Sequence, residues 1–171
     1  MGAHKAIHIQ FDSAGTDSFA YAKILAKVLE ERTFDLILTG KQSQDTDAGL
    51  TGSMLAEFMD MPQATNIIRF GDLTTDSMTV YRKGDYGTEV IGLKLPALVT
   101  VNDSLNEPRL ASMRGIMMAK KKPMETLDPE SLGIGPEMLG LQGSMTEVLC
   151  FEKPESRKEG KHFEGEETET V

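Results

Sequence analysis

The amino-acid sequence predicts an α/β fold with a mostly parallel sheet and an antiparallel strand insertion. Apolar segments without polar alternation, which are typical of strands buried on both faces, alternate with amphipathic segments of helical period. A loop of small residues, 40–52, joins one such strand to one such helix. The first part of the chain therefore has the order of a βαβ unit followed by another helix.

The expected elements of this first part are a strand at residues 6–11, a helix at 18–32, a strand at 36–39 and a helix at 50–59. The first helix has an apolar stripe made by Tyr21, Leu25, Val28 and Leu29. Its alanines keep it slim enough to lie close against a sheet. The strand at 36–39 lacks polar alternation, which predicts that it is covered on both faces.

The next segments predict the insertion and another parallel strand. Strand-like residues 64–70, 77–82 and 88–93 are separated by turn residues, as in an antiparallel meander. The apolar run at 96–101 is expected to be a central strand whose C-terminal end lies beside the loop of residues 40–52. A polar segment and a short helix around 115–121 follow, and residues 146–151 have the pattern of one more strand.

The sequence is expected to divide into a domain of residues 1–122 and a C-terminal arm of residues 123–171. In the last twenty residues only Phe163 and Val171 are sizeable hydrophobes. Such a stretch cannot build a core of its own, so the arm is predicted to be extended and to depend on a partner for order.

Composition narrows the function classes. A net charge of -9 argues against nonspecific nucleic-acid binding, because no broad face would neutralise a phosphate backbone. The single cysteine, Cys150, excludes an internal disulfide framework, and the three histidines lack ligand spacing, so no metal site is expected. No apolar run reaches membrane-spanning length and no targeting segment is recognised. These features predict a cytoplasmic protein without direct membrane insertion.

The loop of residues 40–52 is the first candidate binding site. Glycine-rich backbone at the C-terminal end of a parallel strand, followed by a helix start, favours phosphate binding through backbone N–H groups. The loop is not a Walker A motif, because Asp35 and Gln42 stand where that motif needs a glycine and a Ser or Thr. An ordinary strand-to-helix turn is the alternative interpretation.

A second candidate is the segment Ser13–Ser18, which also follows a strand and precedes a helix. It is similar to the Ser-Gly-Gly-x-Asp-Ser pyrophosphate loop of ATP-pyrophosphatase enzymes, with Ala14 in place of one glycine. The alternative is a helix N-terminus whose side chains satisfy free backbone N–H groups. No Ser-His-Asp or Cys-His set accompanies the segment, so nucleophilic catalysis has no candidate.

Four segments in sequence order resemble the electron transfer flavoprotein beta subunit. They are residues 34–47, which include the loop; residues 80–100, which match the family signature except at Tyr86; residues 105–109; and residues 116–122. The resemblance implies a three-layer α/β/α fold of the adenine nucleotide alpha-hydrolase-like type. It also implies an electron transfer protein subunit and not an enzyme.

The resemblance further implies a cofactor and partners. AMP would be bound structurally by this chain and FAD mainly by an alpha subunit, and the complex would carry electrons from dehydrogenases to a quinone oxidoreductase. The implied AMP-binding residues are Gly40, Lys41, Gln42, Asp45, Asp47, Gly49, Leu50 and Thr51. The implied dehydrogenase-docking residues are Arg109, Leu110, Ser112, Met113 and Arg114. Met113 is at the position of the family's apolar anchor, and the alternative is a helix-start methionine without that role.

Three further expectations follow from where the chain departs from the family pattern and where it matches it. Gly49 and Leu50 replace Asn and Gln, so two polar AMP contacts are lost and AMP binding by this chain alone is expected to be weak or absent. AMP is preferred over a second FAD because residues 93–100 are more similar to the AMP-binding branch. The chain is expected to be a fragment without the family's N-terminal strand and helix and its C-terminal helix, which predicts an uncovered sheet edge that invites pairing with a second copy.

Three functions remain open at this point. The first is the electron-carrier subunit, the second is an ATP-pyrophosphatase-type enzyme of the same fold that uses Ser13–Ser18, and the third is a pure interaction module.

Overall fold

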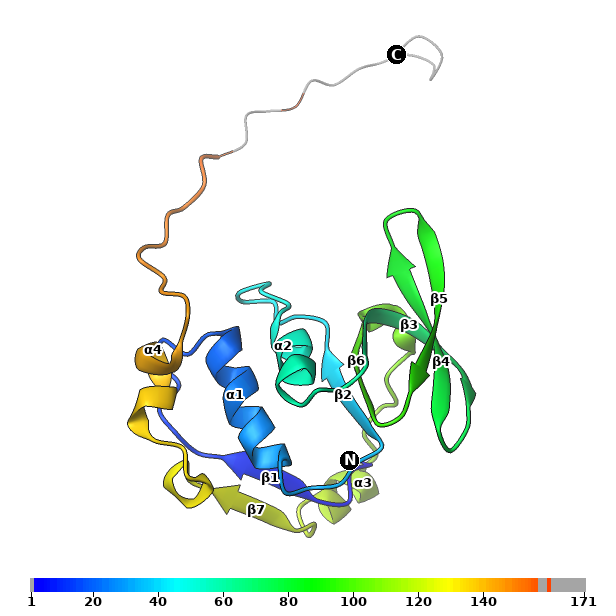
Figure 1. Cartoon of the computed structure of the whole chain (residues 1–171), viewed down its shortest axis with the longest axis horizontal. Coiled ribbons are helices and arrows are strands. Elements are labelled where there is room, and N and C mark those ends of the chain that lie inside the picture. Colours follow the sequence, from blue (N-terminus) through cyan, green and yellow to red (C-terminus); the bar gives the residue numbers. More distant parts are fainter. Residues whose placement is uncertain (1, 157–159, 161–171) are drawn as a thin grey trace.

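The strands form two separate sheets in the computed structural model, which describes residues 2–156 and residue 160 (Figure 1). One sheet pairs β1 with β7, and the other has the order β2-β6-β3-β4-β5. The strands are β1 Ala6–Ile9, β2 Leu36–Gly40, β3 Gln63–Leu73, β4 Ser77–Gly84, β5 Gly87–Lys94, β6 Ala97–Val101 and β7 Met124–Leu127. The helices are α1 Ser18–Leu29, α2 Thr51–Phe58, α3 Met113–Ala119 and α4 Gly140–Gly143, with short 3₁₀ turns at Asp103–Leu105, Glu130–Leu132 and Pro136–Met138.

The predicted α/β fold class is confirmed. β2, β6 and β3 run parallel to one another, as do β1 and β7, and helices flank the strands (Figure 1). β4 is antiparallel to both β3 and β5, so the expected antiparallel insertion is present. β6 lies between β2 and β3, which confirms its prediction as a central strand of the parallel sheet.

β2 departs from its prediction as a strand covered on both faces, and it lies at the edge of its sheet. Its Leu38 side chain is 55% exposed, so the strand is not covered on both faces. β1 and β2 are also in different sheets, so the predicted βαβ unit does not share one sheet. Among the described residues, β1 and β2 each pair on one side only. This agrees with the expected uncovered edge, and pairing with a second copy stays a prediction.

The first part of the core lies between the helices and the parallel strands. It is formed by Ala22 of α1, Leu55 and Ala56 of α2, and Leu98 of β6, all nearly inaccessible to solvent. The predicted close approach of α1 to a sheet is not what the structure shows, because α1 packs mainly against α2. The predicted apolar stripe of α1 is only partly right: Val28 is buried, whereas Tyr21 is 37% exposed and Ala20, Ala22 and Ile24 take the inner positions.

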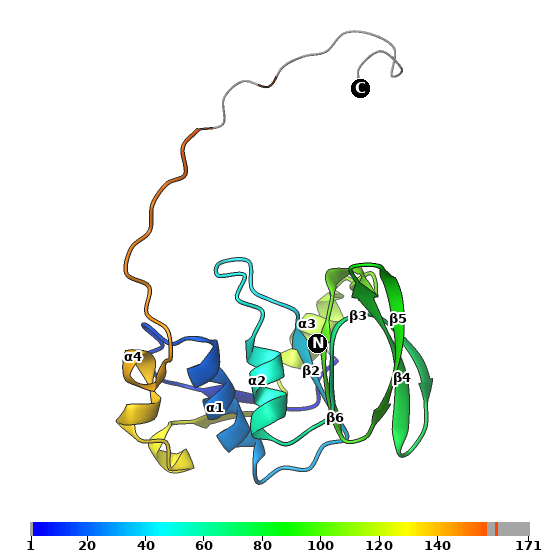
Figure 2. The same cartoon turned by 45° about the horizontal axis from the view of Figure 1, so that its top comes forward.

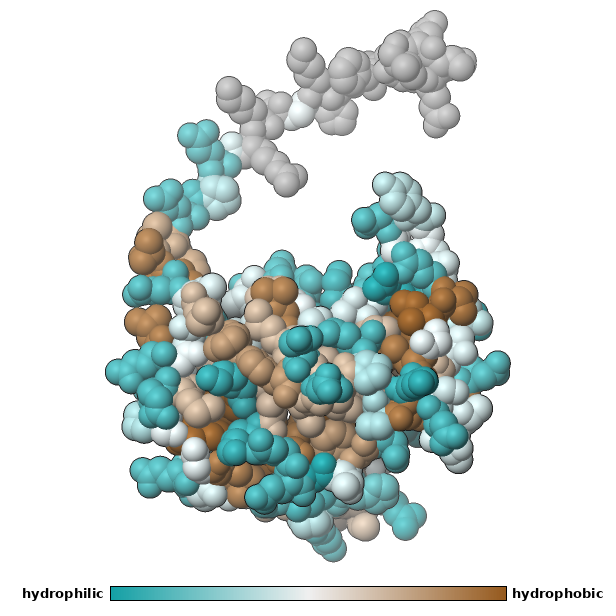
Figure 3. All heavy atoms as spheres, viewed as in Figure 1, coloured by the Kyte–Doolittle hydropathy of each residue, from teal (hydrophilic) through white to brown (hydrophobic). Residues whose placement is uncertain are grey.

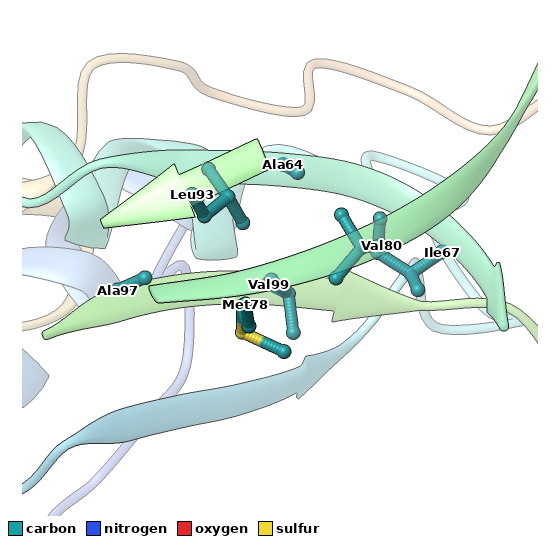
Figure 4. Close-up of a cluster of buried hydrophobic side chains, with 7 residues drawn as sticks. All are labelled: Ala64, Ile67, Met78, Val80, Leu93, Ala97 and Val99. Carbon is teal, nitrogen blue, oxygen red and sulfur yellow. The ribbon is translucent and has the colours of Figure 1, made fainter. Parts of the chain in front are cut away.

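The other face of β6 is covered by strands and not by a helix. The sheet curls so that β4 and β5 stand opposite β6 (Figure 2). Between them lies a second buried cluster, drawn in Figure 4, with Val80, Leu93 and Val99 among its members. Burial of these apolar side chains stabilises the packing of the insertion against β6.

The C-terminal part differs from its prediction in two respects. Residues 124–143 pack onto the domain: β7 pairs with β1 in parallel register, and Ile134 is buried. The strand expected at 146–151 is absent, because these residues have no regular structure in the described chain. The extended segment therefore begins near residue 144, later than the expected boundary at residue 123. Its dependence on a partner stays a prediction, and residues 157–159 and 161–171 of the arm lie outside the described residues.

Hydrophobic side chains gather where the arm leaves the domain (Figure 3). Met145, Val148, Leu149 and Phe151 are 68–93% exposed. Within the described part of the chain, no helix has the length and apolar character needed to cross a bilayer.

Candidate functional site

The predicted phosphate loop lies at the C-terminal ends of two neighbouring parallel strands. It leaves β2 after Gly40, and its Lys41 backbone N–H donates a hydrogen bond of 2.9 Å to the carbonyl oxygen of Val101, the last residue of β6. This contact confirms that the end of β6 neighbours the loop. The carboxyl edge of parallel strands is where open α/β folds bind ligands.

Side-chain hydrogen bonds within the loop hold its shape. The Gln42 side-chain amide donates to the Asp47 carboxylate at 2.9 Å, and the Ser43 and Thr46 hydroxyls lie 3.1 Å apart. The Ser43 hydroxyl and the Thr46 backbone N–H hold the pKa of Asp45 below its usual range. Asp45 thus stays ionised at neutral pH and adds negative charge to the loop.

Gly49 closes the loop in the left-handed backbone region, with φ at 62°. Glycine is the residue that adopts this conformation at no steric cost. Leu50 then precedes α2 without giving it a side-chain cap, although Ser, Thr, Asp or Asn is usual there. The first turn of α2 therefore has backbone N–H groups that are not capped by the Leu50 side chain.

Gly52, in the first turn of α2, sets how closely the helix approaches the strands. A Cβ atom there would lie 2.5 Å from the Thr39 hydroxyl oxygen and 2.7 Å from the Thr100 γ-methyl carbon. The helix start therefore lies directly against the ends of β2 and β6, beside the loop.

The loop, the start of α2, the N-terminal part of β3 and the C-terminal end of β6 line a hollow of about 330 Å³. It is lined by Lys41, Gln42, Asp47, Ala48, Gly49, Ser53, Thr65, Asn66 and Thr100. Lys41, Gln42, Asp47 and Gly49 of the predicted AMP-binding set are among these residues. Gly40, Asp45, Leu50 and Thr51 are not, and Leu50 is 50% exposed.

Four polar residues of the hollow are not among the predicted site residues: Ser53, Thr65, Asn66 and Thr100. Ser53 lies in the first turn of α2, and Thr100 lies near the end of β6. Thr65 and Asn66 reach the hollow through an irregularity in β3. Between its pairings with Val99 and Val101, β3 advances from Ala64 to Ile67, which inserts one extra residue. Such bulges redirect side chains and are common next to functional sites.

The polar groups of the hollow fit a small phosphorylated ligand. The Lys41 ammonium group, the Ser53 and Thr65 hydroxyls and the start of α2 are donors suited to a phosphate. The Asp47 carboxylate is an acceptor suited to a hydroxyl group. The volume is at the lower end of the range for small-molecule sites.

In the other candidate loop, Ser13–Ser18, both carboxylate oxygens and the backbone N–H of Asp17 are hydrogen-bonded within the chain. Asp17 caps α1, accepting from the Ala20 N–H at 2.9 Å. Its second carboxylate oxygen accepts from the Met145 N–H at 2.8 Å and from both the N–H and the hydroxyl of Thr146 at 2.9 Å. The Ser144 hydroxyl accepts from the Asp17 N–H at 2.9 Å. We call this set of contacts the Asp17 clamp.

The Asp17 clamp supports the helix N-terminus interpretation. Partial burial opposes ionisation of Asp17, but the hydrogen bonds from Ala20, Thr146 and Met145 outweigh it and lower the pKa of the carboxyl group. A pyrophosphate group would have to displace the segment of residues 144–146. The geometry therefore gives no support to the ATP-pyrophosphatase alternative.

The predicted docking residues lie on the surface between β6 and α3. Leu110 is 98% and Met113 77% exposed, so neither is a core residue. Met113 is the first residue of α3 and not a loop residue, and Ser112 caps this helix through its hydroxyl, which accepts from the Gly115 N–H at 3.1 Å. Arg109 and Arg114 are exposed beside them. The anchoring role of Met113 stays a prediction.

Comparison with known proteins bears on both surfaces. The family model of the electron transfer flavoprotein domain matches residues 1–132. The chain belongs to the electron transfer flavoprotein family. The matched range includes every predicted site residue, from Gly40 to Arg114.

The curated relatives of this electron transfer flavoprotein chain are beta subunits, as predicted. The human electron transfer flavoprotein subunit beta is 39% identical over 163 residues, which cover 94% of this chain and 61% of the human protein. The subunit of Thermoanaerobacterium thermosaccharolyticum is 36% identical over 92% of this chain and 61% of its own length. That of Dictyostelium discoideum is 34% identical over 98% and 64%. The chain thus spans somewhat less than two thirds of the length of these relatives.

The names of these relatives describe electron transfer proteins. This agrees with the prediction of an electron transfer protein subunit and not an enzyme.

Proposed function

We propose that this electron transfer flavoprotein chain is a subunit of an electron carrier and binds AMP as a structural nucleotide. With an FAD-bearing alpha subunit, it would pass electrons from dehydrogenases to a quinone oxidoreductase. The observation that carries the proposal is the polar hollow between the loop of residues 41–49, the N-terminal part of β3 and the C-terminal end of β6. When bound, AMP would supply no redox chemistry, and the FAD of the alpha subunit would carry the electrons.

The residues of the hollow have distinct roles in this proposal. Lys41 would neutralise the phosphate, and Ser53 together with the start of α2 would donate hydrogen bonds to it. Asp47, held by Gln42 at 2.9 Å, would orient a ribose hydroxyl. Its negative charge also disfavours additional phosphates, which favours a monophosphate ligand.

The exposed segment from Arg109 to Arg114 would dock the dehydrogenase. Met113 would be the apolar anchor, because its flexible and polarisable side chain adapts to differently shaped pockets. Arg109 and Arg114 would control the docking rate and its salt dependence through charge. A cytoplasmic location for the complex stays a prediction from the composition.

An NMR titration with AMP tests the nucleotide site. Binding by this chain alone is expected to be weak, so AMP is added to millimolar concentration and backbone amide resonances are followed. The resonances of Lys41, Gly49 and Ser53 are expected to shift. Lys41→Gln is expected to raise the dissociation constant of AMP about tenfold, because it removes one charge-assisted hydrogen bond. Lys94→Gln on β5 removes the same charge away from the hollow and is the control.

Three outcomes would count against the nucleotide proposal. No shift at millimolar AMP would remove the hollow as a nucleotide site, and tighter binding of FAD than of AMP would favour the second-flavin alternative. Equal weakening by the two lysine variants would indicate a nonspecific charge effect. Steady pyrophosphate release from ATP, abolished by Asp17→Ala, would instead support the enzymatic hypothesis.

The double variant Gly49→Asn, Leu50→Gln is expected to bind AMP better, because it restores the two polar side chains of the family pattern. Asn tolerates the positive φ of position 49.

A further inference from the structure

Asn66 has an unusual backbone conformation for a strand residue. Its φ is 58°, in the left-handed region, within the irregular stretch of β3 that lines the hollow. Asparagine adopts this conformation more readily than other residues with a side chain, but at some cost in free energy. The conformation persists because surrounding groups hold it.

Three hydrogen bonds hold Asn66, each to a different segment. Its backbone N–H donates to the Thr100 hydroxyl of β6 at 3.0 Å, and its side-chain NH₂ donates to the carbonyl oxygen of Lys83 on β4 at 2.7 Å. Its side-chain oxygen accepts from the Asn102 side chain at 2.7 Å. Both the NH₂ group and the oxygen of the Asn66 side-chain amide are therefore hydrogen-bonded within the protein. The neighbouring Thr100 is buried, at 3% exposure.

Asn102 continues this chain of contacts toward the docking segment. Its side-chain oxygen accepts from both the N–H and the hydroxyl of Ser104 at 3.0 Å, which caps the 3₁₀ turn Asp103–Leu105. Its backbone N–H donates to the Ile67 carbonyl oxygen at 2.9 Å. The turn leads directly into the polar segment that carries the docking residues 109–114.

We infer that Asn66 is a positioning residue that couples occupancy of the hollow to the segment leading to the docking residues. The inference rests on the proposed function, because it concerns the same hollow and the same docking surface. A ligand that contacts Thr65 or Asn66 would change the position of the Asn66 amide, and the Asn102 side chain would pass that change to the turn at 103–105. Coupling of this kind is a difference in free energy between two sites and acts in both directions.

The test uses the full chain and AMP as the probe. In the wild type, millimolar AMP is expected to shift the amide resonances of Gly49 and Thr65, which line the hollow, and also those of Ser104 and Leu105, which do not. Asn66→Gly keeps the positive φ but removes the side-chain amide. In this variant the AMP-dependent shifts of Ser104 and Leu105 are expected to be lost. The shifts of Gly49 and Thr65 are expected to persist in Asn102→Ala, because Asn102 does not line the hollow.

Two further variants separate coupling from loss of stability. Asp60→Gly makes the same kind of change at another left-handed residue, with φ at 50°, that does not line the hollow. It is expected to keep the Ser104 and Leu105 responses even if its thermal midpoint falls as much as that of Asn66→Gly. Asn102→Ala removes the hydrogen bond between the Asn66 and Asn102 side chains by changing Asn102, and it is expected to abolish the Ser104 and Leu105 responses. This variant tests the coupling even if Asn66→Gly does not fold.

The outcomes distinguish this inference from the proposed function. Wild-type shifts at Gly49 and Thr65 without shifts at Ser104 and Leu105 would overturn the inference alone, as would responses that survive in Asn66→Gly or Asn102→Ala. No AMP-dependent shift at any residue would overturn both. Loss of the Ser104 and Leu105 responses in the two asparagine variants, but not in Asp60→Gly, would support the coupling.

Discussion

Substitution of Gly52 by alanine is expected to destabilise the chain, although alanine is the better helix former. The gain in helix propensity is about 1 kcal/mol. The new methyl group would lie 2.5 Å from the Thr39 hydroxyl oxygen and 2.7 Å from the Thr100 γ-methyl carbon, both on strands of the sheet. Overpacking of this kind costs about 1–3 kcal/mol, and more when several contacts are involved. Two contacts shorter than 3.0 Å place the cost in the upper part of that range, about 2–3 kcal/mol, so a net loss of about 1–2 kcal/mol is expected.

Urea unfolding followed by circular dichroism measures this difference in free energy of unfolding. Gly92→Ala on β5 is the control, because no heavy atom outside its chain neighbours lies within 4 Å of the place that the new methyl group would occupy. Combining Gly52→Ala with Thr39→Ala and Thr100→Ser removes both obstructing atoms while keeping a hydroxyl for Asn66, and should recover part of the loss. A Gly52→Ala chain as stable as the wild type would refute the argument that contact with the strand ends sets the position of α2.

Three further predictions concern the other surfaces. The pKa of Asp17 in the folded chain lies below its ordinary value of 3.8, so the Asp17 clamp should contribute fully to stability above that pH and lose its contribution as the pH falls through the lowered value. Hydrogen exchange of residues 144–146 should accelerate in that acidic range, and Asp17→Asn should accelerate it already at neutral pH. Met113→Ala should slow electron transfer from an acyl-CoA dehydrogenase or similar donor to the complex with an alpha subunit, with flavin content and thermal midpoint unchanged. Met145→Ala, at 74% exposure against 77%, should leave the rate unchanged, and an unchanged rate in Met113→Ala would contradict the anchoring role. Leu38→Lys on the open edge of β2 should reduce self-association in size-exclusion chromatography, and an unchanged elution volume of a dimer would exclude that edge as the contact.

The sequence predicted those parts of the fold in which local pattern and tertiary position agree. The apolar run of β6 is buried from Ala97 to Thr100, and the turn residues of the insertion separate β3, β4 and β5 as expected. The run of β2 has the same character, yet Leu38 is exposed, and no described strand pairs with the outer edge of β2. Apolar periodicity reports on the environment for which a strand is suited and not on which neighbours are present.

The candidate site was predictable to a similar extent. Lys41, Gln42, Asp47 and Gly49 follow one another in a recognisable loop, so local sequence placed them in the hollow. Thr65 and Asn66 lie inside a strand-like run, and their place at the site depends on one extra residue in the pairing of β3 with β6. That register shift arises from long-range contacts with Thr100, Lys83 and Asn102, which no local pattern contains. The strand expected at 146–151 does not form, and no described strand pairs with this segment.

Native mass spectrometry of the chain co-expressed with an electron transfer flavoprotein alpha subunit tests the central claim most directly. The account predicts a complex of one copy of each polypeptide that carries FAD and AMP, and predicts that Lys41→Gln lowers the AMP occupancy without lowering the FAD occupancy. An alpha subunit that purifies with its FAD but without this chain would contradict the proposed partnership. A complex with FAD but with no AMP in either the wild type or the double variant Gly49→Asn, Leu50→Gln would contradict the nucleotide site.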